Sequence, residues 1–234
     1  MQVYKLVYLA RRNPAVSRED WPEVWVSHAK FAGQFAFIAN DITYSCYANR
    51  IDRPMLEGQA VDVPGLSREH DGVALGVALQ VETLQGGGFS KDERALIDQD
   101  ELRVFDMLTP KFSYYCTETV LKQGKYGEYG LIRFLARREE LSSDAFQSHF
   151  HGEFADTAGK AIDASVVRCA LDRPIHDPLP LFPFDAIIDC WFDSQDDAVR
   201  AALDPAMPQA LAQFCDMDRS VTMLTHAFRR RKQD

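Results

Sequence analysis

SREDWPEVWVSHAKFA, at residues 17–32, has the residue spacing of an amphipathic helix. Its apolar positions are Trp21, Val24, Trp25, Phe31 and Ala32. His28 follows Trp21 by seven residues, so it lies on the same stripe as the two tryptophans. A titratable ring on a face meant for burial is either a core residue with a hydrogen-bond partner or part of a functional site.

A second, diverged copy of this helix is predicted at SSDAFQSHFHGEFADTA, residues 142–158. Phe146 and Phe150 take the places of the two tryptophans. Glu153 takes the place of His28. This position of the helix therefore carries an ionisable group in either half of the chain.

The elements around the two copies follow one order. Alternating apolar runs predict first-half strands at 2–10, 42–51, 70–83 and 111–122, and helices at 17–32 and 90–108. The second half has predicted strands at 128–137, 165–172, 184–193 and 220–229, and helices at 142–159, 194–203 and 208–214, the last two separated near Pro205. Each half has the order β-α-β-β-α-β, which predicts repeats at residues 1–123 and 124–234.

Short matches between the halves support the repeat. LVYLARR at 6–12 is similar to LIRFLARR at 131–138, and HDGVAL at 70–75 lies where PFDAII lies at 183–188. These matches pair Asp71 with Asp185. YANRI at 47–51 matches the region of ALDRP at 170–174, which pairs Asn49 with Asp172. TETV at 117–120 matches THAF at 225–228, which pairs Glu118 with His226.

Two β-α-β-β-α-β repeats predict an α+β fold made of two ferredoxin-like halves. Each half has a four-stranded antiparallel sheet with helices on one face. The open face of each sheet needs a partner, because an apolar sheet face is otherwise exposed to water. The two sheets are expected to pack on each other as a pseudo-twofold α+β barrel.

Bulk properties exclude several classes of protein. A net charge of −9 and a pI of about 5.2 argue against a nucleic-acid or anionic-membrane partner. No run approaches the roughly 18–20 apolar residues of a membrane span, and the N-terminus lacks a signal-peptide pattern, so a cytoplasmic protein is expected. The five cysteines form no C-x-x-C pair and are expected to be buried apolar residues. His149 and His151 are two apart rather than four, so no metal site is predicted.

The order SREDWPEVWVSHA, YANRI and HDGVALGVALQVET resembles the EthD family of the dimeric α+β barrel superfamily, here in a tandem form with both subunits fused. The resemblance implies a cofactor-independent enzyme of the lyase, isomerase or monooxygenase kind, with its ligand between the sheet and the long helices of one half. It maps the family's helix histidine, strand asparagine and D-G aspartate onto His28, Asn49 and Asp71. The second half departs from this pattern, since it carries Glu153, Asp172 and Ala186 there.

His28 is the leading catalytic candidate, because an imidazole with a pKa of about 6.5 exchanges protons near neutral pH. Asp71 is expected either to orient His28 or to be a turn residue at a strand entrance. Asn49 is a candidate donor to a substrate oxygen. Trp25 is expected to be a core residue or a substrate platform, and Tyr8 and Tyr47 are candidate cavity residues. Each half carries one histidine and one glutamate: His28 and Glu118 in the first half, and His226 and Glu153 in the second. Each combination is either an acid–base pair in its cavity or a chance match.

The residues and the resemblance together predict an enzyme without a cofactor, acting on a small, largely apolar, aromatic or polyketide-like molecule. Proton transfer by His28 would support lyase chemistry: dehydration, decarboxylation or C–C cleavage. The alternatives are a cofactorless monooxygenase acting on a phenol, or a non-catalytic hydrophobic-ligand-binding or stress protein. A haem role is a further alternative, because distant relatives of the fold bind haem. The chain is expected to be a monomer with an internal barrel or a homodimer.

Overall fold

A computed structural model describes residues 3–232, and the side chains as far as Phe228. Within these residues, hydrogen bonds join the long strands of an eight-stranded antiparallel barrel in a closed order. That order is β1 (Tyr4–Ala10), β5 (Gly72–Ala78), β2 (Ile42–Arg50), β10 (Cys215–Lys232), β7 (Tyr129–Arg137), β9 (Ala186–Phe192), β8 (Val166–Pro174) and β6 (Ser113–Lys122). The expected antiparallel α+β architecture is confirmed at this level.

The described chain forms two compact units. Unit 1 consists of residues 3–49, 69–117 and 228–232, and unit 2 consists of residues 50–68 and 118–227. Residues 50–68, which the sequence places in the first repeat, therefore belong to unit 2. They include a short hairpin, β3 (Met55–Leu56) and β4 (Gln59–Ala60). Strands β6 and β10 each contribute to both units.

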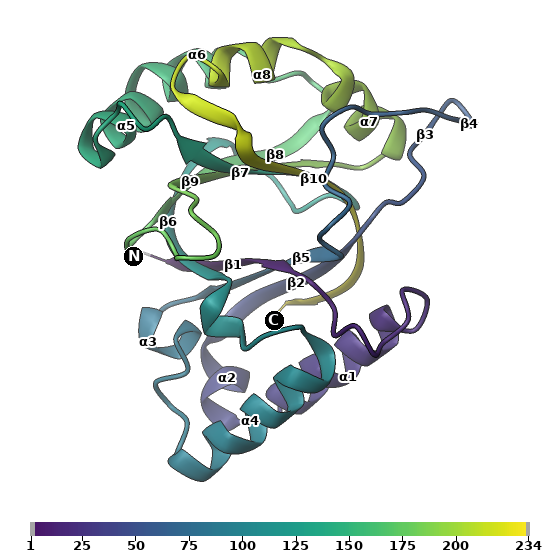
Figure 1. Ribbon diagram of the computed structural model, residues 1–234, viewed down its shortest axis with the longest axis vertical. Helices are drawn as coiled ribbons and strands as arrows, with labels where there is room; N and C mark the ends of the chain where they lie inside the picture. Colours follow the sequence, from purple (N-terminus) through teal and green to yellow (C-terminus); the bar gives the residue numbers. More distant parts are fainter. Residues whose placement is uncertain (1–2, 233–234) are drawn as a thin grey trace. The chain divides into compact units, whose positions relative to one another are not determined.

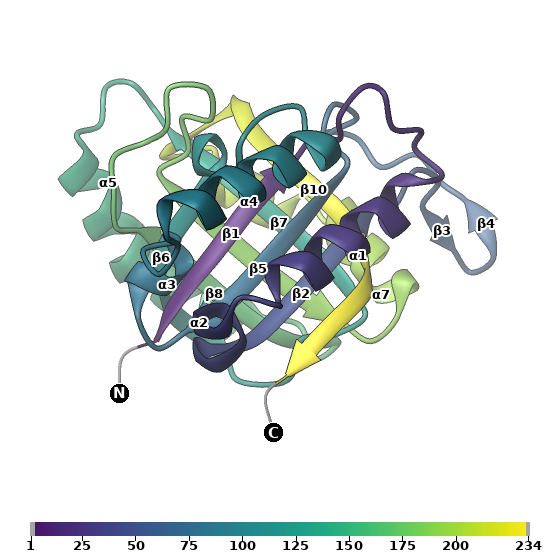
Figure 2. The same ribbon diagram turned by 90° about the horizontal axis from the view of Figure 1, so that it is seen from below.

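Unit 1 holds the sheet order β6-β1-β5-β2. One face of this sheet is covered by helices (Figures 1 and 2), which are α1 (Trp21–Ala32), α2 (Ala36–Asp41), α3 (Val81–Leu84) and α4 (Lys91–Val104), with a 3₁₀ turn η1 (Thr109–Lys111) after them. Asp20 is the N-cap of α1 and Pro22 lies in its first turn, where a missing N–H costs little. Ser90 and Glu93 form a capping box at α4, which confirms the predicted helix start.

Unit 2 holds the order β10-β7-β9-β8. Its helices lie over one face of this sheet (Figure 1) and are α5 (Ser143–His149), α6 (Ala155–Ala161), α7 (Gln195–Leu203) and α8 (Ala206–Leu211), with a π-helical turn η2 (Phe150–Phe154) between α5 and α6. Helices α7 and α8 are separated near Pro205, as the sequence predicts. Buried aromatic and aliphatic side chains fill the space between these helices and the sheet.

The two units repeat one ion pair. In unit 1 the backbone N–H of Arg12 donates to Asp71 at 2.9 Å, and its guanidinium donates to the same carboxylate at 2.7 Å. In unit 2 the backbone N–H of Arg137 donates to Asp185 at 2.9 Å, and its guanidinium does so at 3.1 Å. Both aspartates are buried, so each arginine neutralises a carboxylate that water does not reach.

This shared ion pair fixes which other residues correspond. Asp172 pairs with Ile187, which lies two residues after Asp185. The residue two after Asp71 is Val73, and Val73 pairs with Ala48 rather than with Asn49. The sequence match of Asn49 with Asp172 is therefore displaced by one residue in the strand registers.

The two helix copies agree at their first apolar positions and then diverge. Trp21, Trp25, Phe146 and Phe150 are all fully buried, as expected. The π-helical turn in the second copy then adds a residue, and Gly152 leaves helical geometry there. As a result Phe154 turns into the core, while the side chain of Glu153 is 83% exposed. Glu153 consequently does not take the buried position that His28 occupies in α1.

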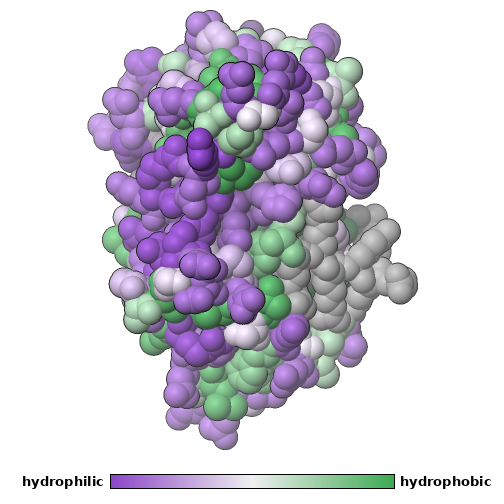
Figure 3. Space-filling view, turned by 90° about the vertical axis from the view of Figure 1, so that its right-hand side faces the viewer, coloured by the Kyte–Doolittle hydropathy of each residue, from purple (hydrophilic) through white to green (hydrophobic). Residues whose placement is uncertain are grey.

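Some large apolar side chains remain exposed on the surface of the protein. On the face drawn in Figure 3, hydrophobic residues form small separate areas among hydrophilic ones. All five cysteines are buried free thiols, in agreement with the expected apolar role. No helix in the described part of the chain is long and apolar enough to cross a membrane.

Candidate functional site

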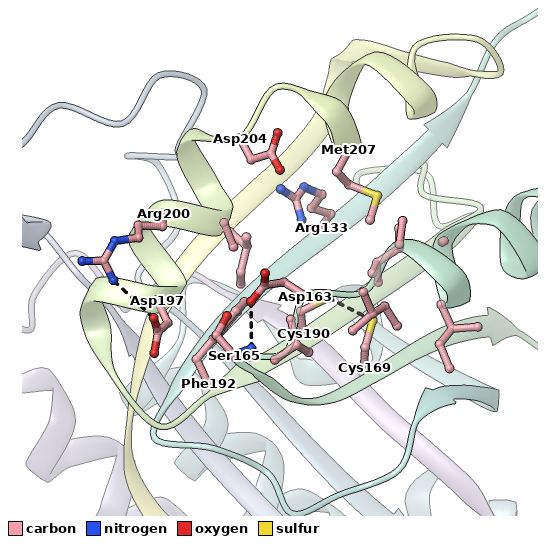
Figure 4. Close-up of a pocket in the computed structure, with 18 of the residues that line it drawn as sticks. Arg133, Asp163, Ser165, Cys169, Cys190, Phe192, Asp197, Arg200, Asp204 and Met207 are labelled. Carbon is pink, nitrogen blue, oxygen red and sulfur yellow. Dashed lines mark hydrogen bonds and ion pairs between the residues drawn. The ribbon is translucent and has the colours of Figure 1, made fainter.

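A mostly apolar cavity of unit 2 lies between its sheet and its helices. Its volume is about 250 Å³. Strands β7, β8 and β9 form its floor, and helices α6, α7 and α8 form its walls (Figure 4). Most of the lining is apolar and includes Leu131, Phe154, Ile162, Leu171, Ile188 and Phe192. Such a mostly apolar space between sheet and helices suits a small organic molecule.

Arg133 is the unusual residue of this cavity. It lies on β7 between Leu131 and Leu135, on the strand face that packs against the helices, and is only 3% exposed. Burial lowers the pKa of its guanidinium, although the nearby Cys190, Cys169 and Asp204 oppose that shift. No residue in the described part of the chain forms a hydrogen bond or ion pair with it.

The other charged groups around the cavity are engaged. Asp163 accepts a hydrogen bond from the backbone N–H of Ser165 at 2.7 Å. Arg200, at the rim, contacts Asp197 at 3.3 Å and Glu57 at 2.8 Å. Asp204 is exposed and accepts from the backbone N–H of Ala206 at 2.9 Å. Arg133 thus differs from its neighbours in having no counter-ion bound to it.

Two thiols face each other on the cavity floor. Cys169 and Cys190 lie directly opposite on β8 and β9, and their sulfur atoms are 3.0 Å apart. The hydrogen bond to Cys190, followed by burial, raises the pKa of Cys169 well above the ordinary value of a thiol. Because the thiolate is the nucleophilic form, this shift makes Cys169 a poor nucleophile near neutral pH.

Tyr8 and Arg133 occupy corresponding positions in the two units. Each lies four residues before the arginine of its unit's ion pair, and its partner on the neighbouring strand lies three residues after the aspartate. Tyr8 is buried, and its hydroxyl accepts a hydrogen bond from Nε1 of Trp25 at 3.0 Å. Burial, followed by the nearby Tyr47, raises the pKa of Tyr8 well above its ordinary value.

The structure therefore brings together three predicted substrate-binding residues, Tyr8, Trp25 and Tyr47. The ring centroids of Trp25 lie 6.0 Å from Tyr8 and 5.4 Å from Tyr47. The cavity beside them, lined by Leu6, Tyr8, Ser45, Tyr47, Ala74 and Gly76 among others, has a volume of about 80 Å³. That is space for roughly two or three water molecules, at about 30 Å³ each, and not for an aromatic substrate.

His28 links two helices. Its Nδ1 lies 2.7 Å from Oδ2 of Asp100 on α4, and its ring meets Phe105 edge-on at 5.4 Å. The hydrogen bond with His28 lowers the pKa of Asp100, and Arg103 adds to that shift. His28 lines neither the unit 1 cavity nor the shallow groove on the other side of α1, lined by Pro22, Glu23, Val26, Ser27, Lys30 and Phe228.

The predicted catalytic residues have separate surroundings. Asp71 binds Arg12, and its carboxylate also lies 3.7 Å from Arg18. Asn49 lies opposite Gly72 on the neighbouring strand, and its Oδ1 is buried with no hydrogen-bond partner among the described residues. Within the same residues, no hydrogen bond links any two of His28, Asp71 and Asn49. Asp100, which sequence reasoning missed, takes the place beside His28 that was expected for Asp71.

The remaining predicted site residues also lie apart from one another. Glu118 accepts a hydrogen bond from the buried Arg168 at 2.7 Å. His226 is exposed and stacks on Tyr129, with ring centroids 5.0 Å apart. Glu153 lies on the surface, 3.7 Å from Nδ1 of His149. These contacts give each residue a local structural partner.

The side chains of the unit 2 cavity do not fit a haem. Haem iron takes an axial histidine, cysteine, methionine or tyrosine. The described lining offers neither histidine nor tyrosine, and its two cysteines are hydrogen-bonded to each other. Its methionine, Met207, lacks the histidine that accompanies methionine on a haem iron. In the described part of the chain, no group of three or more histidine, cysteine, aspartate or glutamate side chains is placed to hold a metal ion.

Comparison with known proteins identifies the fold. No family model and no curated protein matches the chain. Solved structures do, and those below belong to the dimeric α+β barrel superfamily. An anthrone oxidase-like protein matches with a TM-score of 0.58 and 10% identity over 99% of this chain and 93% of its own. A proposed monooxygenase from Lactobacillus acidophilus matches at 0.53 and 7% over 100% and 97%.

A third match is a variant chlorite dismutase from Candidatus Nitrospira defluvii, with a TM-score of 0.52 and 13% identity over 97% of this chain and 91% of that one. At such low identities the similarity shows the fold and no particular reaction. The chain has the fold of the dimeric α+β barrel superfamily, and its match to the EthD motifs remains a resemblance in sequence.

Proposed function

We propose that this chain is a fused two-repeat barrel of the EthD type, and that it binds and transforms a small, largely apolar molecule in the cavity of unit 2. The observation that carries the proposal is the mostly apolar space of about 250 Å³ between sheet and helices. The corresponding space in unit 1 is about 80 Å³, and Tyr8 and Tyr47, whose rings pack against Trp25, are among its lining residues. The first repeat keeps the family-like motifs, while the second provides the room for a ligand.

The reaction we favour is lyase chemistry: dehydration, decarboxylation or carbon–carbon cleavage. Such reactions build negative charge on carbon or oxygen, and a preorganised cation in a site of low dielectric stabilises it. Arg133 is a cation of this kind in the cavity wall. A cofactorless oxygenation of a phenol or anthrone also proceeds through an oxygen anion, and the anthrone oxidase-like and monooxygenase relatives of the fold favour it as the alternative.

A non-catalytic ligand carrier is the second candidate function. It is favoured by the carboxylates around the cavity, which already accept hydrogen bonds. Asp163 and Asp204 each accept from a backbone N–H, and Asp197 accepts from the hydroxyl of Ser194. Oxygen uptake with anthrone as the probe separates oxygenation from both other functions. Turnover of a bound molecule without oxygen uptake separates the lyase from the carrier.

The site itself is tested by filling each cavity in turn. The neutral dye N-phenyl-1-naphthylamine, whose fluorescence rises in apolar surroundings, is the probe. Ala201→Trp places an indole in the unit 2 cavity, and Ala32→Trp does the same in the unit 1 cavity. We expect dye binding to be lost in the first variant and kept in the second, with both folded by circular dichroism. The reverse result would move the site to unit 1.

A further inference from the structure

We infer that the ligand of the unit 2 cavity is a monocarboxylate with an apolar body, and that the guanidinium of Arg133 binds its carboxylate. This inference rests on the proposed function, because it takes the unit 2 cavity to be the ligand site. It adds the charge of the ligand, which neither the fold nor the resemblance specifies. Arg133 and Arg168, two buried arginines of unit 2, differ in what surrounds their guanidinium groups.

Arg168 shows how this unit holds a buried arginine for structural purposes. It is 4% exposed, and it donates to Glu118 at 2.7 Å. Its guanidinium also lies 4.7 Å from the ring of Tyr126. Burial alone would lower the pKa of Arg168, but Tyr126, Glu118 and Asp189 raise it above its ordinary value. Glu118 is therefore its counter-ion, although its Nε has no hydrogen-bond partner among the described residues.

Arg133 is buried to the same extent without this compensation. It is 3% exposed, and its pKa is lowered because burial outweighs the charges around it. Asp204, the one carboxylate that acts on it, is exposed and forms no ion pair with it (Figure 4). A buried charge without a partner destabilises a fold. Among the described residues, the cavity thus holds a cation with no counter-ion bound to it. A bound anion supplies that missing charge.

The lining defines the rest of the ligand. A guanidinium presents paired N–H donors that match the two oxygens of a carboxylate. The floor of the cavity around Arg133 is apolar, with Leu131, Ile188 and Phe192 among its residues. Arg200, the other cation that lines the cavity, is already bound to Asp197 and Glu57, so a second negative charge has no cation to meet. One carboxylate on an apolar body fits this arrangement, and a phosphate dianion does not.

The test uses two molecules of one shape. 1-Naphthoate and 1-naphthamide each displace N-phenyl-1-naphthylamine from the wild-type protein at low salt. We expect 1-naphthoate to bind at least tenfold more tightly than the neutral amide. Arg133→Met, which keeps the apolar length of the side chain, should keep dye binding and abolish this preference. Arg138→Met, which removes a surface charge outside the cavity, should keep both.

The outcomes separate the inference from the proposed function. Equal affinities of the wild-type protein for naphthoate and naphthamide would overturn the inference, as would a preference that survives in Arg133→Met. In either case dye binding that Ala201→Trp abolishes would leave the proposed site standing. If the dye does not bind the wild-type protein, or binds equally to Ala201→Trp, the proposed function fails and this inference fails with it.

Discussion

Corresponding positions of the two units hold Tyr8 and Arg133, and the two side chains have opposite environments. The hydroxyl of Tyr8 is hydrogen-bonded to Trp25, and the cavity beside it is about 80 Å³. The guanidinium of Arg133 has no partner among the described residues, and its cavity is about 250 Å³. One strand position therefore completes a core in unit 1 and leaves an open, charged cavity in unit 2.

The difference shows how a repeated fold can divide its tasks. A satisfied polar group in a filled core adds stability and leaves no space for a ligand. An unsatisfied cation beside an empty space costs stability, and a ligand can repay that cost. Unit 1, which carries the tryptophan helix and His28, has the first character. Unit 2 has the second, although its helix lacks the histidine.

The largest expected effect on the free energy of unfolding concerns the arginine–aspartate ion pair that both units contain. Arg12→Met and Arg137→Met each remove the guanidinium that donates to a buried aspartate, so each should lower the free energy of unfolding by about 3 kcal/mol. The loss should be the smaller one in Arg12→Met, because Arg18 still lies 3.7 Å from Asp71. Urea unfolding followed by circular dichroism measures both, with Arg138→Met as the exposed control expected to change it by less than about 0.5 kcal/mol. A large loss in one unit and none in the other would show that the two ion pairs are not equivalent.

A smaller effect is expected at the closed position of unit 1. Tyr8→Phe removes the oxygen that accepts from Nε1 of Trp25 and leaves a buried indole N–H unpaired. The free energy of unfolding should fall by about 1–2 kcal/mol, and dye binding in unit 2 should be unchanged. An unaltered unfolding curve would mean that the Tyr8 hydroxyl does not stabilise unit 1.

His28 and Glu153 form the next comparison, because they take matching places in the two helix sequences. His28→Ala removes the link between α1 and α4 and should lower the free energy of unfolding by about 1 kcal/mol. Glu153→Ala alters an exposed side chain and should change it by less than about 0.5 kcal/mol. A His28→Ala variant of unchanged stability that has lost turnover of a bound molecule would return His28 to a catalytic role.

The smallest effect depends on pH. The pKa of Asp100 is lowered in the folded protein, chiefly by its hydrogen bond with His28. A lowered carboxyl pKa stabilises the fold above the ordinary value of 3.8, and this contribution is lost as the pH falls through the lower, folded value. The difference in unfolding free energy between the wild type and Asp100→Asn should therefore shrink below about pH 4. The pair is partly exposed, so the whole effect should stay under about 1 kcal/mol. A difference that grows on acidification would contradict this assignment.

Much of the architecture follows from apolar spacing alone. The burial of Trp21, Trp25, Phe146 and Phe150 was predictable because a helix repeats its faces every three to four residues. The π-helical turn after Phe150 was not, because nothing in the local residues distinguishes it from a regular helix. That one additional residue moved Glu153 from the expected cavity to the surface.

The candidate site was harder to predict. His28 was correctly placed on a buried helix face. Its partner Asp100, and the partner Arg12 of Asp71, depend on contacts between distant segments, which spacing does not report. Arg133 did leave a signal. It is a single charge inside LIRFLA, a run that is apolar on both faces of its strand. A charge in such a strand is buried in either register, and that observation points to the cavity.

The central claim is that Arg133 is kept for a ligand and not for the fold. The free energy of unfolding of Arg133→Met, measured in urea without ligand and again with excess 1-naphthoate, tests it most directly. Without ligand the variant should be more stable than the wild type by about 1–3 kcal/mol, because an unpaired buried charge is removed. With naphthoate the wild type should gain stability and the variant should gain little. A variant that is less stable than the wild type without ligand would show that Arg133 holds the fold together, and would contradict the account.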